Sequence, residues 1–181
     1  MNRKIKLFAL CSLPFALCTI SPARADIVDL YAGASAGIGT AHFHDQNYSM
    51  ASYGAVFGID IPVFRAELEY NFLSGDRGTG DINAHAAMLN AYAKLLPTPV
   101  IKPYIGAGIG YVLGGQVSDG KSGNNDINSS LAYQGMVGLQ FDLTVIPIIF
   151  DIEGRIMHVA DIFPDNDLTH FDARLKARYV F

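Results

Sequence analysis

Alternation of apolar and polar positions is the dominant pattern of this chain after Asp26. In the last eleven residues, apolar side chains at the odd positions alternate with Asp172, Arg174, Lys176 and Arg178 at the even ones. A period of two is typical of a β-strand with one apolar and one polar face. The same pattern recurs in seven earlier segments, at 28–40, 51–60, 64–72, 87–95, 104–111, 133–142 and 148–156. The chain is therefore predicted to form eight β-strands.

The links between these strands alternate in length. Long links at 41–50, 74–84, 113–130 and 160–170 alternate with short ones at 61–63, 96–100 and 144–147. Barrels of the outer membrane have short turns on the periplasmic side and longer loops outside, and their tilted strands need about nine to eleven residues to cross the bilayer. The predicted fold is all-β, an eight-stranded antiparallel up-and-down transmembrane β-barrel with four external loops.

The charged residues of the strands share the face that carries the glycines. They are Arg65, Glu67, Glu69, Lys94, Asp142, Asp151, Glu153, Arg155, Asp172, Arg174, Lys176 and Arg178. A basic side chain facing lipid costs about 2–4 kcal/mol at the bilayer midplane, so this face is expected to line the lumen. Eight strands enclose a space only wide enough for side chains. We expect an interior salt-bridge network that fills the barrel.

Other folds also produce alternation. A soluble sandwich or a ligand-binding barrel has its apolar face inward and its charged face in water. The regular order of long and short links favours the membrane barrel. A narrow ion pathway between the luminal charges remains an alternative to a filled interior.

The first 25 residues differ from the rest of the chain. Arg3, Lys4 and Lys6 precede an apolar run at 7–20, and Ala23-Arg24-Ala25 follows. This order is typical of a secretory signal peptide cleaved after Ala25. The alternative is a membrane anchor, but the run is shorter than the roughly 20 residues that a helical span needs. We predict a signal peptide at 1–25, a barrel domain at 26–181, and export through the general secretory pathway.

Composition narrows the chemistry. Both cysteines, Cys11 and Cys18, lie in the predicted signal peptide, so the barrel domain has no thiol for a disulfide, a metal or nucleophilic catalysis. Removal of the peptide's four basic residues leaves nine Lys and Arg against 17 Asp and Glu, a balance that disfavours a nucleic-acid partner. No phosphate loop or dinucleotide fingerprint is present. We expect no cofactor and no metal site.

Three short segments resemble a known group of proteins. Lys102-Pro103-Tyr104-Ile105-Gly106-Ala107-Gly108-Ile109-Gly110-Tyr111 resembles the signature strand of the small outer-membrane β-barrel superfamily, which includes the membrane domain of outer membrane protein A, opacity-type proteins and other porin-like β-barrel domains. Leu30-Tyr31-Ala32-Gly33-Ala34 is similar to its first strand. Tyr179-Val180-Phe181, with aromatic Tyr179 and Phe181, resembles the C-terminal signal recognised by the barrel-assembly machinery.

The resemblance implies a location in the bacterial outer membrane of a Gram-negative envelope. The implied partners are outer-membrane lipid, lipopolysaccharide and, during biogenesis, the barrel-assembly machinery. A host or envelope ligand could bind the external loops, but the sequence does not identify one. We therefore expect a non-enzymatic barrel that contributes to envelope integrity or to adhesion through its loops.

Two other functions are considered. One is a small passive pore for ions or small solutes. The other is a lipid A-modifying enzyme, because deacylases of related fold carry a His-x-Ser motif late in the chain. The corresponding stretch here is Met157-His158-Val159-Ala160, which lacks the serine, and His158 falls on the predicted lipid face.

Overall fold

A computed structural model describes residues 28–43, 46–76, 80–96, 98–119, 123–127, 129–143, 146–163 and 166–181. The predicted signal peptide lies outside this part of the chain. The strands are β1 (Asp29–Phe43), β2 (Gln46–Asp60), β3 (Phe64–Asp76), β4 (Gly80–Lys94), β5 (Ile101–Asp119), β6 (Gly123–Ile127), β7 (Ser130–Asp142), β8 (Ile148–Phe163) and β9 (Asn166–Val180). Within the described ranges, no helix is long and apolar enough to cross a membrane.

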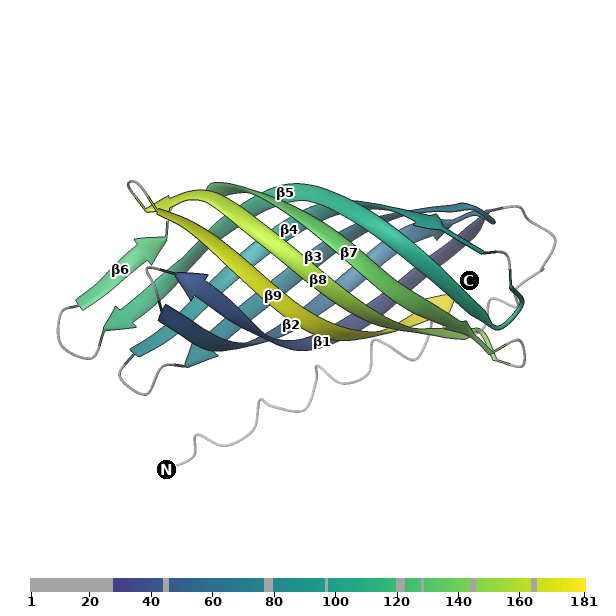
Figure 1. Cartoon of the computed structure of the whole chain (residues 1–181), viewed down its shortest axis with the longest axis horizontal. Helices are drawn as coiled ribbons and strands as arrows, with labels where there is room; N and C mark the ends of the chain where they lie inside the picture. The colour runs from purple at the N-terminus through teal and green to yellow at the C-terminus, as the bar shows by residue number, and fades with distance from the viewer. Residues whose placement is uncertain are drawn as a thin grey trace, which may run out of the picture.

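Eight of the strands close into an antiparallel barrel (Figure 1). Neighbouring strands follow the order β4-β3-β2-β1-β9-β8-β7-β5, and pairing between β4 and β5 closes the circle. The predicted eight-stranded barrel is thus confirmed. The remaining strand, β6, pairs with β5 and extends that hairpin beyond the barrel.

The barrel has two distinct rims. We call the end where β1 begins and β9 ends the terminal rim, and the opposite end the hairpin rim. The links 61–63, 95–100 and 143–147 lie at the terminal rim. The links β1 to β2, β3 to β4, β5 to β7 and β8 to β9 lie at the hairpin rim.

Three of the four predicted long links at the hairpin rim are wrong, whereas the fourth is confirmed, because pairing of β5 with β7 ends at Val112 opposite Ser130. Pairing between β1 and β2 continues to Phe43 opposite Gln46, and pairing between β3 and β4 continues to Asp76 opposite Asp81. Only residues 44–45, 77–79 and 164–165 remain between three of the strand pairs. The alternation of apolar and polar residues ends toward the hairpin rim, where the outward positions are no longer apolar. Backbone pairing, however, needs only N–H and C=O groups, so the strands continue past the pattern.

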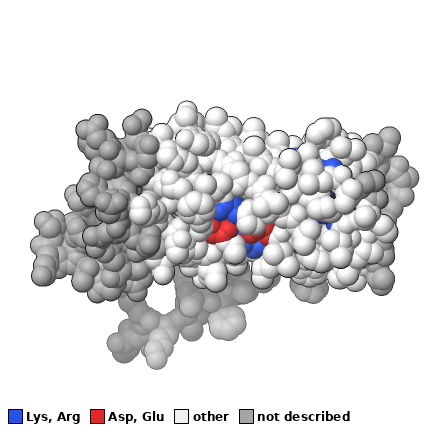
Figure 2. All heavy atoms as spheres, in the orientation of Figure 1, with Lys and Arg blue, Asp and Glu red and all other residues white. Residues whose placement is uncertain are grey.

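The barrel is apolar outside and polar inside. Ile38, Leu68 and Leu175 face outward with 74%, 58% and 62% of their surface exposed, whereas Glu69 and Arg178 are fully buried inside. Figure 2 shows a wall with few charged residues on the viewed face. This inside-out distribution is that of a protein surrounded by lipid rather than water.

Inward glycines leave room for the main chain of a neighbouring strand or for a large luminal side chain. A Cβ atom at Gly39 would lie 2.0 Å from the carbonyl oxygen of Phe171 on β9, and one at Gly106 would lie 2.4 Å from the ring of Tyr92. Gly114 has a positive φ of 146°, at the place where the register of β4 against β5 shifts. Only glycine adopts this conformation without strain, so Gly114 permits the bulge.

Candidate functional site in the barrel interior

The candidate site is a network of charged side chains in the lumen, which we call the charged network. Its acidic members are Asp60, Glu67, Glu69, Asp142, Asp151, Glu153 and Asp172, and its basic members are Arg65, Lys94, Lys102, Arg155, Arg174, Lys176 and Arg178. Seven acids therefore meet seven bases. Inward positions recur every second residue on each strand, so β9 supplies a row of cations that β3 and β8 oppose.

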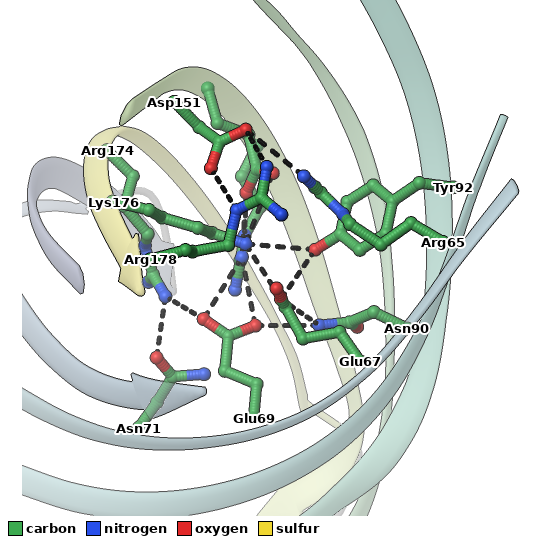
Figure 3. Close-up of polar contacts among 12 residues, drawn as sticks. Arg65, Glu67, Glu69, Asn71, Asn90, Tyr92, Asp151, Arg174, Lys176 and Arg178 are labelled. Atoms are coloured by element: carbon green, nitrogen blue, oxygen red, sulfur yellow. Dashed lines mark hydrogen bonds and ion pairs between the residues drawn. The ribbon is translucent and has the colours of Figure 1, made fainter. Parts of the chain in front are cut away.

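Glu69 lies at the centre of the network (Figure 3). Arg174 donates from Nη1 to its Oε1 at 2.6 Å, and Arg155 Nη2 lies 3.0 Å from its Oε2. Asn90 donates to the same Oε2 at 2.8 Å. One fully buried carboxylate thus pairs with two guanidinium groups and joins β3, β4, β8 and β9, while Glu153 and Asp172 supply the second anion to Arg155 and Arg174.

Glu67 forms a second centre with Lys176. The ammonium nitrogen of Lys176 lies 2.9 Å from Glu67 Oε1 and 3.4 Å from an oxygen of Glu153. Tyr31 and Tyr92 each donate a hydroxyl hydrogen bond of 2.9 Å to Glu67. Lys176 also donates to the hydroxyl of Tyr92 at 2.9 Å, so this lysine, which is 2% exposed, has three oxygen partners.

Asp151 dominates the part of the network nearer the terminal rim. It accepts two hydrogen bonds from Arg178, at 2.6 and 2.9 Å, and one from Arg65 at 3.1 Å. The Arg65 guanidinium also lies 3.8 Å from the ring centre of Tyr92 and 4.6 Å from that of Tyr104. Cation–π contacts of this kind are strongest where water is excluded.

Two further ion pairs lie at the terminal rim itself. Lys94 pairs with Asp60, which also lies 3.4 Å from Arg178. Lys102 pairs with Asp142 at 2.8 Å, and both side chains are 22% exposed. The network is therefore buried through most of its length and reaches solvent at this end.

The lumen nearer the hairpin rim is mostly apolar, with the buried polar residues His170 and Ser130 at the same level. Inward residues there form one buried cluster, which we call the apolar layer: Ala41, Met50, Leu73, Ala84, Ala86, Met88, Val112, Ala132, Met157 and Val159. On β8, Met157 and Val159 follow the last network residue, Arg155, toward the hairpin rim. Sequence analysis missed this layer, because its inward residues carry no charge while polar residues such as Ser49 and Asn83 stand at outward positions, so that charge no longer marks the inward face.

The structure brings all twelve predicted charged residues inside the barrel, each in at least one ion pair. The prediction omitted Asp60 and Lys102, although both stand at inward positions in the alternation. It also omitted the neutral partners Tyr31, Tyr92 and Asn90, whose position in the same pattern was available as a signal. Tyr179 and Phe181 lie at the terminal rim with their rings in edge contact, 5.4 Å between centres.

The arrangement holds its charges in place, because every charged member faces a counter-charge. Within the described residues, no group of His, Asp and Glu could hold a metal ion. His158 faces outward, with its ring 4.9 Å from that of Tyr133 and its Nδ1 3.2 Å from the hydroxyl of Thr169.

Comparison with known proteins identifies one matching family and several solved structures of similar fold. The family described as outer membrane protein beta-barrel domain matches residues 10–181. No curated protein matches the chain in sequence.

Among solved structures, Neisserial surface protein A (NspA) has a TM-score of 0.66 at 17% identity, covering 81% of this chain and 95% of that one. The outer membrane enzyme PagL has a TM-score of 0.55 at 15% sequence identity, and the match covers 80% of this chain and 97% of PagL. OprG from Pseudomonas aeruginosa has a TM-score of 0.52 at 13% identity, and the match covers 85% of this chain and 95% of OprG. At these identities the likeness concerns the fold alone.

Proposed function

The chain belongs to the family of outer membrane protein beta-barrel domains and is a barrel of the bacterial outer membrane, and from this premise we propose that it is a closed structural barrel. In this proposal it conducts no ions and catalyses no reaction. It acts through its outer surfaces, in envelope integrity or in contacts made at its external end.

One observation carries the proposal: the charged network and the apolar layer occupy successive parts of the same lumen. An ion entering at the terminal rim would have to separate buried pairs such as Arg174 and Glu69, which are joined at 2.6 Å. It would then meet ten buried residues of the apolar layer, which offer no oxygen ligand from their side chains. Apolar constrictions block ions because water leaves them.

We assign the terminal rim to the periplasm. Both chain ends of single-chain outer-membrane barrels lie there, beside short turns. Tyr179 and Phe181, at the same rim, then occupy the place of the C-terminal signal for the barrel-assembly machinery. The signal peptide at 1–25 and secretory export complete the proposed route, with outer-membrane lipid and lipopolysaccharide as the surroundings of the folded barrel.

Conductance of the purified barrel in a planar bilayer tests the closed state. Folding is verified first by the shift in gel mobility between heated and unheated samples. We expect no steady conductance, and a double variant, Met88→Ala with Met157→Ala, serves as a control that thins the apolar layer. Steady conductance of the unaltered barrel, changed in size by Glu69→Gln, would make the protein a small passive pore instead.

The non-enzymatic part of the proposal rests on the surroundings of His158. Val159 and Ala160 follow it, so a serine is absent from the position that a His-x-Ser motif requires. Its ring contacts Tyr133 and Thr169 on the outer wall. Mass spectrometry of lipid A from cells that overproduce the protein should show an unchanged profile. Loss of an acyl chain that depends on His158 would identify a deacylase.

A further inference from the structure

The outer wall of the barrel has a shallow, open hollow over β1, β7, β8 and β9. Its volume is about 600 Å³, and its apolar border includes Val137, Ile156 and Phe171. Gly135, Gly154 and Ala173 also line it, and the strand register places Gly154 directly between Val137 on β7 and Ala173 on β9. The border of the hollow carries large apolar side chains, whereas its floor consists of glycine and alanine.

Packing does not require the two outward glycines. A Cβ atom at Gly154 would meet its nearest neighbours at 3.9 Å, and one at Gly135 would meet Ile156 at 3.6 Å. These are ordinary contacts, in contrast to the 2.0 Å clash that an inward Cβ would make at Gly39. A side chain at Gly154 would therefore occupy part of the hollow without a close contact at its Cβ atom, and the hollow is not a consequence of tight packing.

The hollow offers no charge to a ligand. Arg155 and Asp172 belong to its lining. The side chains of Arg155 and Asp172 are 2% and 0% exposed because both point into the lumen. Only main-chain atoms of these residues can border the hollow, so it suits hydrocarbon rather than a charged headgroup.

Position along the barrel indicates the leaflet. Gly135 and Ile156 lie two residues from Tyr133 and His158, whose rings stack on the outer wall toward the hairpin rim. Aromatic rings of this kind lie at the membrane interface. With the hairpin rim outside, as proposed above, the hollow lies in the outer half of the membrane, where the surrounding lipid is lipopolysaccharide.

We propose that this hollow is a docking site for an acyl chain of lipopolysaccharide. The wall of a second barrel is convex, and two hollows facing each other across a twofold axis would leave a void. A flexible hydrocarbon chain can follow the concave surface and contact Val137, Ile156 and Phe171 together. The proposal rests on the proposed orientation in the membrane but not on the closed lumen.

Native mass spectrometry of the folded full-length barrel, titrated with purified lipid A, tests the proposal. Gly154→Leu places a side chain in the floor of the hollow, and Ala55→Leu adds the same side chain to an exposed outward position on β2 as a matched control. We expect Gly154→Leu to weaken lipid A binding about tenfold, the equivalent of roughly two buried methylene groups, with little change from Ala55→Leu. Heat-dependent gel mobility checks that both variants fold.

Equal binding by the three proteins would overturn the site. A dimer that Gly154→Leu abolishes would identify a second copy as the occupant and would also overturn it. Tighter binding of a phospholipid with the same saturated chains would reject lipopolysaccharide as the source. A conducting barrel that binds lipid A through Gly154 would contradict the closed lumen and leave the docking site intact.

Discussion

The charged network and the apolar layer fill neighbouring parts of one lumen in opposite ways. In the network, each group depends on particular partners: Glu69 accepts from Arg155, Arg174 and Asn90 at once. In the apolar layer, residues such as Met88 and Met157 make contacts without direction, and any apolar side chain of similar size can replace them.

This difference concerns how each region tolerates change. A buried ion pair contributes little net stability, because desolvation offsets much of the attraction, yet removal of one partner leaves an uncompensated charge. The network therefore fixes the arrangement of the strands more than it stabilises them. In the proposed closed barrel, the apolar layer blocks the lumen, and it constrains the choice of side chains less than the charged network does.

The largest expected effect is that of Glu69→Gln. The substitution keeps the shape of the side chain but leaves Arg155 and Arg174 with one fewer anion in a buried site. We expect the free energy of unfolding to fall by about 3–5 kcal/mol, as in other buried pairs that lose one partner. Urea unfolding of the barrel in lipid vesicles measures this loss. A loss of unfolding free energy smaller than that expected for an exposed ion pair would show that the network is hydrated and that its members are weakly coupled.

A smaller loss is expected from Gly39→Ala, which tests how tightly the wall packs against the network. The new Cβ would lie 2.0 Å from the carbonyl oxygen of Phe171 and 2.7 Å from Cα of Asp172. These main-chain atoms cannot move aside independently, so we expect a loss of about 1–3 kcal/mol. Gly154→Ala, outward on β8, is the matched control and should change stability by less than about 0.5 kcal/mol. Equal effects at the two positions would contradict the packing described here.

Met157→Leu tests the tolerance of the apolar layer. The two side chains have similar volumes, and no hydrogen bond depends on the sulfur in the contacts described. We expect a loss of less than about 1.5 kcal/mol in the same unfolding measurement, and no conductance. A loss as large as that of Glu69→Gln would remove the distinction between the two regions.

Sequence alone predicts the barrel because membrane strands must satisfy lipid on one face and the lumen on the other. The alternation on β9, from Phe171 to Phe181, follows directly from that requirement. The inward orientation of the charged residues follows from the same cause. Where the surroundings no longer differ between the faces, as near Phe43 and Gln46, the pattern ends while the backbone pairing continues.

The pairing of the network could not be predicted in the same way. That Arg174 meets Glu69 depends on the shear of the barrel and on which strands face each other across the lumen, and neither quantity is encoded in the period of one strand. The hollow on the outer wall was also hidden, since Gly135 and Gly154 lie on different strands and become neighbours only through register.

The smallest effect is expected at the terminal rim, from Asp142→Asn. Asp142 pairs with Lys102 at 2.8 Å, but both side chains are 22% exposed, so water and salt screen the attraction. We expect a loss of less than about 1 kcal/mol, which should shrink further when unfolding is measured at high ionic strength. A loss of several kcal/mol that is insensitive to salt would mean that the rim pair is coupled to Asp151 and Arg178, and the charged network would then extend undivided to the terminal rim.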